Sequence, residues 1–461
     1  MVERTPKPDW KSSFRTIVFA ALAAAVLLGV VAGELTPFVS RVQQKKTGML
    51  MRGGDTFMRM YYVAWDANWG EAGTRLFLRT AADFYQSALK IDPSGFEARL
   101  CTMFTFRLLG QPTEAGLLIQ PTRKGELPES TRSGLGAAYA MVLSENPAVS
   151  AMETAHDYLF TLGPGPALIA NGYREIGEEA RAAETLAEAA GQARKRLRGL
   201  RMAVLANGLV VLFGMVLLVW AIARGVRRRT TPGEPAPFPT KAVGMREATE
   251  ALILWVFFGA VFVRLATRMV PAGGEPPVLL VLAPAVAAEA VAIGWVWMAT
   301  GFGARFGWAL SGAWWRIPIG VGATGAAVLP VLGTYTLVQT WLGKSAADDP
   351  IVPLLVAPDT LLTKALLVVG VGLVGPMLEE TLFRGIVFGA LRRQWSFWPA
   401  AGATSALFAV AHLNPAGIPA YFALGVVFAY LVERTRSLVT PWAAHAAFNL
   451  FNLAMLLSLF G

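Results

Sequence analysis

Long apolar runs separated by short polar segments fill the second half of the chain. Most runs are close to about 20 residues, the length that an α-helix needs to cross a hydrocarbon core of roughly 30 Å. The pattern therefore predicts an all-α fold, a polytopic α-helical membrane protein with about nine spans. The predicted spans cover residues 17–32, 203–223, 249–269, 278–300, 317–342, 361–390, 398–413, 417–433 and 439–460.

Residues 35–202 follow a different pattern, polar and helix-favouring with short Gly and Pro breaks. Within them, several residues fall at spacings that resemble a tetratricopeptide repeat (TPR), a helix pair with small and aromatic residues at set positions. A second copy is degraded, with Ala115 its main match, and a single repeat cannot bury its own apolar face. We therefore expect a helical extramembrane domain, either TPR-like or unrelated to such repeats. The residues at repeat spacing are Trp65, Ala81, Tyr85, Ala88 and Pro93.

These changes of pattern divide the chain into five parts. The first is expected to be an uncleaved anchor, with a signal peptide cleaved after Ala32 as the alternative. Residues 178–198 read as one long helix that leads to the membrane. The expected parts are an N-terminal membrane anchor (1–34), the helical extramembrane domain (35–202), a transmembrane helix (203–224), a cytoplasmic linker (225–248) and a membrane domain (249–461).

Composition agrees with a membrane protein, because 54% of the residues are hydrophobic and only 16% are charged. Soluble domains carry roughly a quarter of charged residues. The net charge of +10 does not indicate nucleic acid as a partner, since the basic residues gather at the ends of apolar runs. The single cysteine, Cys101, excludes an internal disulfide and a cysteine-based metal site.

Arginines in the predicted loops indicate an orientation. They fall in alternate loops of the membrane domain, and basic loops stay on the cytoplasmic side. Counting back places the N-terminus in the cytoplasm and residues 35–202 outside it. Five basic residues between Arg194 and Arg201 conflict with this orientation. The loop arginines are Arg305, Arg316, Arg392, Arg393, Arg434 and Arg436.

Two adjacent carboxylates, an arginine and two imidazoles stand in the apolar runs of residues 360–455. Such a group at the centre of a bilayer costs roughly 2.5–3.5 kcal/mol on insertion scales, and it marks a functional site by default. Glu380 and Arg384 are four residues apart, so they can pair on one helical face. Together the residues supply a carboxylate base, imidazoles and an amide able to stabilise an oxyanion. The candidate residues are Glu379, Glu380, Arg384, His412, His445 and Asn449.

The ordered motifs EExxxR, FxxxH and HxxxN over residues 360–455 resemble the CAAX-protease and bacteriocin-processing family of intramembrane proteases, which includes the type II prenyl endopeptidases. The resemblance implies that Glu379, with His412, activates a water molecule to attack a peptide carbonyl. His445 and Asn449 would stabilise the oxyanion, and Glu380 and Arg384 would support the site. Its expected substrate is a membrane-embedded peptide or protein.

Two questions stay open at this point. The family is often classed as metalloproteases, and Glu379, His412 and His445 could bind zinc, but an H-E-x-x-H motif is absent and Asn449 is a poor zinc ligand, which favours no metal. The predicted spans also offset His412 from the other residues by roughly 10 Å along the helix axis.

The main alternative function is a non-catalytic membrane scaffold or immunity-type protein whose helical domain binds a peptide or protein partner. A transporter is disfavoured, because the two halves show no inverted repeat. Glu289, in the middle of the span at 278–300, could serve either helix–helix pairing or the substrate path.

Overall fold

The computed structural model describes the chain in eleven stretches, and the regular elements of these residues are all helices. The predicted all-α fold is confirmed. The predicted anchor at residues 1–34 and most of the predicted linker at 225–248 lie outside the described residues. The described residues are 46–118, 136, 138–142, 144, 147–227, 243–269, 278–301, 306–308, 316–342, 361–412 and 414–460.

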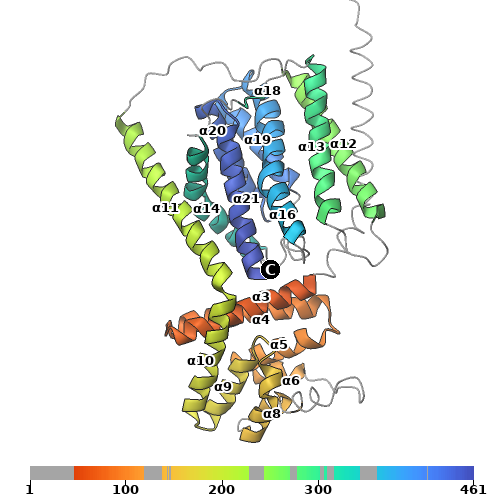
Figure 1. Ribbon diagram of the computed structural model, residues 1–461. Coiled ribbons are helices and arrows are strands. Elements are labelled where there is room, and N and C mark those ends of the chain that lie inside the picture. The colour runs from red at the N-terminus through yellow and green to blue at the C-terminus, as the bar shows by residue number, and fades with distance from the viewer. Residues whose placement is uncertain are drawn as a thin grey trace, which may run out of the picture. The chain divides into compact units, whose positions relative to one another are not determined.

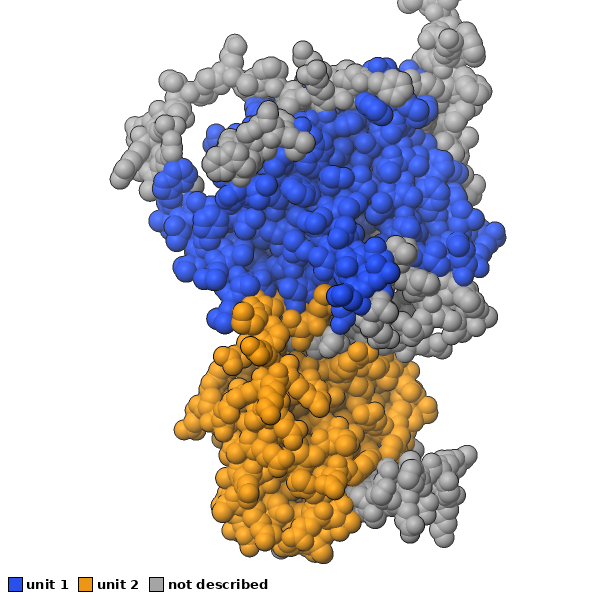
Figure 2. All heavy atoms as spheres, viewed as in Figure 1, with its two compact units in different colours: residues 1–41, 205–346, 357–454 blue, residues 42–204, 347–356, 455–461 orange. Residues whose placement is uncertain are grey.

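The chain divides into two compact units, which Figure 2 shows in blue and orange. Unit 1 comprises residues 1–41, 205–346 and 357–454, and unit 2 comprises residues 42–204, 347–356 and 455–461. Unit 1 therefore contains every candidate site residue, and unit 2 contains the stretch expected to be a helical domain.

Unit 2 is built from amphipathic helices, several of which are joined by tight turns (Figure 1). At one turn, a carboxylate oxygen of Asp92 accepts hydrogen bonds from the backbone N–H and the hydroxyl of Ser94. Such an Asx turn reverses the chain between two helices. The helices are α3 (Lys46–Asp66), α4 (Gly70–Ile91), α5 (Phe96–Leu108), α6 (Pro112–Leu117), α8 (Val149–Leu159), α9 (Gly165–Glu175) and α10 (Glu179–Arg196).

The residues at repeat spacing lie mostly in the core of unit 2. Ala81, Tyr85 and Ala88 are completely buried on α4. Pro93 is exposed in the turn after that helix. A tetratricopeptide-like fold stays a prediction. The helix expected over residues 178–198 is α10, and Leu197 separates it from the next helix.

Unit 1 is a bundle of long apolar helices, with α12 packed beside α13 and α19 beside α20 (Figure 1). Six helical stretches of the described chain are long and apolar enough to cross a membrane; α19 is shorter, and α21 is not among the six. A multi-pass membrane protein follows, and the count of nine spans stays a prediction. The helices are α11 (Arg198–Arg227), α12 (Met245–Met269), α13 (Val278–Ala299), α14 (Arg316–Trp341), α16 (Leu361–Val369), η3 (Gly370–Val374), α17 (Gly375–Glu379), η4 (Glu380–Phe388), α18 (Gly389–Arg392), α19 (Phe397–Ala411), α20 (Ile418–Thr435) and α21 (Val439–Phe460).

Glycines bring α11 and α14 into close contact. A Cβ atom on Gly214 would strike the backbone of α14, and one on Gly325 would strike the carbonyl of Val210 on α11. Small residues serve this purpose in membranes because helix association there depends on van der Waals contact rather than on the hydrophobic effect.

The stretch from Leu361 to Arg392 is continuous but not uniformly α-helical. Two segments of it, η3 and η4, are π-helical. π-Helical turns are rare and occur often at functional sites. The EExxxR motif begins at the last residue of α17 and continues through η4, so the predicted candidate residues lie at this irregularity.

Candidate active site

Glu380 and Arg384 form an ion pair inside unit 1. Arg384 Nη1 donates to Glu380 Oε1 at 3.0 Å, and both side chains are completely buried. The pair that the i, i+4 spacing predicts is therefore present. A second guanidinium nitrogen donates to the carbonyl of Gly425 on α20 at 3.4 Å.

Aromatic rings surround the buried guanidinium. The Cζ atom of Arg384 lies 4.3 Å from the ring centroid of Phe408, 5.1 Å from that of Phe428 and 5.9 Å from that of Phe383. A cation near aromatic faces is attracted by their quadrupoles, and more strongly when water is excluded. Three helical segments are thereby joined around one positive charge.

His445, on α21, lies between the two glutamates. Its Nδ1 atom is 3.0 Å from Glu380 Oε1, and its Nε2 atom is 3.7 Å from Glu379 Oε2. The ring stacks on Phe428 with a centroid separation of 4.9 Å. Because Glu380 is an acceptor paired with Arg384, Nδ1 carries the proton and Nε2 faces Glu379.

Glu379 differs from its neighbour in both exposure and partners. Its side chain is 24% exposed, whereas that of Glu380 is completely buried. Within the described residues, Glu379 Oε2 has no hydrogen-bond partner. Glu380 Oε1 accepts from both Arg384 and His445. Glu380 Oε2 likewise has no partner among these residues. The two glutamates therefore differ in exposure and in pairing with Arg384, and Glu379 is the partly exposed one outside the ion pair.

His412 is the C-cap residue of α19, directly after the last helical residue, Ala411. Its Nδ1 atom is 2.8 Å from the carbonyl oxygen of Phe408, which can only accept, so Nδ1 holds the proton and Nε2 is left as an acceptor. His412 and His445 both contact the Phe408 ring, with centroid separations of 4.7 and 5.6 Å. His412 also interacts electrostatically with Glu379. The ring of Phe408 thus lies in contact with both histidines.

Asn449 lies one turn after His445 on α21. Its Nδ2 atom donates to the carbonyl of Val371, on π-helix η3, at 2.9 Å. An amide nitrogen has two N–H groups, so this bond fixes the side chain and leaves one donor. The structure thus brings Glu379, Glu380, Arg384 and His445 into direct contact, with His412 and Asn449 attached to the surrounding backbone.

The metal alternative requires at least three converging ligands. Among the described residues, which include both glutamates and both histidines, no group of three His, Cys, Asp or Glu side chains is arranged to hold one ion. The donor set therefore does not fit a zinc site in this arrangement, and no step below uses a metal.

Several residues around the site fall outside the motifs. Tyr421 stacks on His412 at 4.3 Å between centroids, and Phe428 stacks on His445. Glu289, which the sequence singles out, is buried on α13 and interacts electrostatically with Glu379. A lone aromatic residue in an apolar helix gives no signal of function, so sequence reasoning could find Glu289 but not these rings.

The fold is that of an α-helical multi-pass membrane protein. Residues 361–451 match the family model "Type II CAAX prenyl endopeptidase Rce1-like". In this region the chain is similar to CAAX-type membrane proteases, and the match covers less than half of the chain.

Two curated relatives each match part of the chain. The chain is 35% identical over 97 residues to the "Putative membrane peptidase YdiL" of Bacillus subtilis, which is 21% of this chain and 40% of the relative. It is 37% identical over 87 residues to the "Membrane-embedded CAAX protease MroQ" of Staphylococcus aureus, covering 18% of this chain and 35% of the relative. The matches thus span less than half of either relative's length. No solved structure shows a significant match.

Proposed function

We propose that the chain is an intramembrane endopeptidase that hydrolyses a peptide bond of a membrane-associated protein or peptide. The observation that carries the proposal is the difference between the two adjacent glutamates. Glu380 is completely buried and accepts from Arg384 and His445, whereas the side chain of Glu379 is 24% exposed and lies outside that ion pair. A partly exposed carboxylate beside a fixed, buried one can reach a water molecule, as a general base must.

In the proposed reaction, Glu379 accepts a proton from water while the water oxygen attacks the carbonyl carbon of the substrate. The Nε2 lone pair of His412 accepts the second hydrogen bond of that water and orients it, because Nδ1 is held by Phe408. When the tetrahedral intermediate collapses, the C–N bond breaks and Glu379 returns its proton to the leaving amine. Proton transfer of this kind contributes about 10²–10⁴-fold to a rate.

The oxyanion is proposed to form between His445 and Asn449. His445 can donate from Nε2 only as the doubly protonated ring, since Nδ1 already donates to Glu380. Asn449 would donate its remaining N–H while the other stays on Val371. Donors fixed in advance stabilise developing charge without reorganising, which is the usual basis of an oxyanion hole.

The test compares two glutamate variants in purified full-length protein with a fluorogenic peptide library. We expect Glu379→Gln to lower cleavage by at least about 100-fold without changing thermal stability. Glu380→Gln is expected to lower the stability, because it alters a completely buried ion pair. Arg434→Gln, an exposed change on α20, is the matched control and should alter neither property.

The same assay separates the alternatives. A chelator is expected to leave the cleavage activity unchanged. Loss of cleavage in the presence of chelator would favour the zinc alternative. Cleavage that persists in Glu379→Gln would refute the assigned base. Absence of cleavage in the wild type, combined with a cellular phenotype that survives Glu379→Gln, would favour a non-catalytic scaffold.

We also propose that the arginine loops of unit 1 face the cytoplasm, which places residues 35–202 outside. Contacts within unit 1 support the placement of these loops at one end of the helices. Arg392, after η4, and Arg436, after α20, both pair with Glu433. The backbone N–H of Leu438 also donates to the carbonyl of Gly307, which joins a third loop to this end. The positive-inside rule places such basic loops in the cytoplasm.

A further inference from the structure

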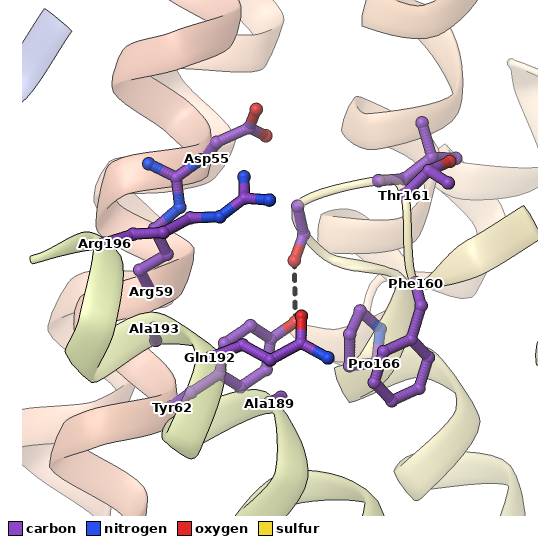
Figure 3. A pocket seen from close by; sticks show the side chains of 12 residues that line it. Asp55, Arg59, Tyr62, Phe160, Thr161, Pro166, Ala189, Gln192, Ala193 and Arg196 are labelled. Carbon is purple, nitrogen blue, oxygen red and sulfur yellow. Dashed lines mark hydrogen bonds between the residues drawn. The ribbon is translucent and has the colours of Figure 1, made fainter. Parts of the chain in front are cut away.

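Unit 2 contains a pocket that the proposed protease reaction does not use. Its volume is about 320 Å³, and it lies between α3, α10 and the turn that follows α8 (Figure 3). Pockets for small ligands begin at roughly this size. In Figure 3, Asp55, Arg59 and Arg196 lie along one side of the pocket, and Phe160 and Pro166 lie across from them.

The two arginines reach the pocket from different helices. Arg59 comes from α3 and Arg196 from the last turn of α10. Within the described residues, neither guanidinium forms a hydrogen bond or an ion pair. Burial lowers the pKa of Arg59, and the neighbouring charge of Arg196 lowers it further, while Asp55 opposes both effects. The charged form of Arg59 is thus incompletely compensated.

One carboxylate faces these two positive charges. Tyr85 donates a hydrogen bond to Asp55 Oδ1 at 2.6 Å, and this bond holds the Asp55 side chain in place. Burial raises the pKa of Asp55, although Tyr85 and both arginines act in the opposite direction. With Asp55 ionised, one positive charge in the pocket remains uncompensated. A single negative charge would balance it, whereas a dianion such as phosphate would exceed it and would be repelled more strongly by Asp55 than a monoanion is.

The far side of the pocket is held rigidly and is largely apolar. Tyr62 donates to the carbonyl of Gly163 at 2.7 Å and accepts from the N–H of Ala167 at 3.3 Å, so its hydroxyl is fully engaged. A Cβ atom on Gly163 would strike Asp55 and Tyr85, so only glycine allows the turn to approach so closely. Phe160 and Pro166 add apolar surface.

We propose that this pocket binds a carboxylate carried by an apolar group, with Arg59 and Arg196 holding the carboxylate and Phe160 and Pro166 contacting the apolar part. Guanidinium groups match the planar carboxylate through paired N–H donors. A peptide C-terminus with an apolar last residue and a free aliphatic acid share this chemistry. The site is separate from the proposed protease site and stands without it.

The first test measures binding of three probes to full-length protein in detergent micelles by saturation-transfer NMR, with empty micelles as the blank. The probes are acetyl-Ala-Ala-Leu with a free carboxylate, the same peptide as its C-terminal amide, and 4-methylpentanoate. We expect a carboxylate probe to bind and the amide not to bind. Binding of the peptide identifies a C-terminus as the ligand, and binding of 4-methylpentanoate alone identifies a free acid. Equal binding of peptide and amide, or no carboxylate binding at about 10 mM, would overturn the proposal.

The second test uses charge variants whose effects differ in sign. Arg59→Gln and Arg196→Gln should each weaken carboxylate binding by at least about tenfold. Asp55→Asn should strengthen it, because a repelling charge is removed while Oδ1 can still accept from Tyr85. Arg75→Gln, an exposed arginine on α4 paired only weakly with Glu71, is the control and should leave binding unchanged.

Each variant also needs a check that unit 2 stays folded. Cys101 is completely buried, so its failure to react with a thiol reagent reports an intact core. If Asp55→Asn weakened binding as much as Arg196→Gln did, with Cys101 still protected, the charge-based assignment would be wrong.

Discussion

Arg384 and Glu380 form an ion pair at 3.0 Å in which both side chains have no exposed surface. Within the membrane unit, this pair fixes the carboxylate that also accepts from His445. Removing one partner of a buried pair leaves an uncompensated charge and costs about 3–5 kcal/mol.

We therefore expect Arg384→Gln to lower the thermal unfolding temperature clearly, and Arg384→Lys to recover only part of the loss. Lysine keeps the charge but loses the planar donors that reach Gly425 and the face contact with Phe408. Thermal unfolding of the detergent-solubilised protein measures this, with Arg434→Gln as the exposed control. Full stability in Arg384→Lys would show that charge alone matters.

Cys101 is expected to be inert in the folded protein. The thiol is completely buried on α5, and burial raises its pKa well above the usual value. The thiolate is the reactive form, so both accessibility and ionisation oppose reaction. A maleimide should label the native protein negligibly and label it fully in denaturant. Rapid labelling of native wild type would contradict the packing of unit 2.

Asp55 should make the stability of unit 2 depend on pH. Burial raises its folded-state pKa above 3.8, so its contribution is largest below that pH and is lost as pH rises through the raised pKa. Asp55→Asn removes this dependence, which amounts to at most about 1.4 kcal/mol per pH unit within the window. Hydrogen exchange of α3 and α4 should therefore show the variant better protected than wild type at neutral pH. The advantage should shrink in acid; a constant ratio would show that Asp55 does not titrate there.

The orientation can be tested with one introduced cysteine. Ser150 is exposed on α8, in the part proposed to lie outside the cytoplasm. In cells, Ser150→Cys should react with a membrane-impermeant maleimide, while wild type with only Cys101 should not. Labelling of Ser150→Cys that appears only after the membrane is permeabilised would reverse the topology.

Two of the five basic residues that conflict with this orientation have partners or sites in unit 2. Arg194 pairs with Asp66 on α3, and Arg196 lines the pocket beside Arg59. These charges thus have local roles in the folded unit. A count of loop charges cannot distinguish them from charges that determine topology.

The sequence by itself determined the features that depend on spacing along one helix. Apolar runs predicted the all-α membrane fold, and the spacing of Glu380 and Arg384 predicted their ion pair, because the turn of a helix is a local property. The three ordered motifs were sufficient to indicate the family.

Only the tertiary structure decided which side chains of different helices contact one another. It distinguished the partly exposed Glu379 from Glu380, which is completely buried and accepts from His445 and Arg384. It also brought Arg59 and Arg196, far apart in the sequence, to one pocket. Such contacts follow from how side chains of distant segments pack, and no pattern within a single helix encodes them.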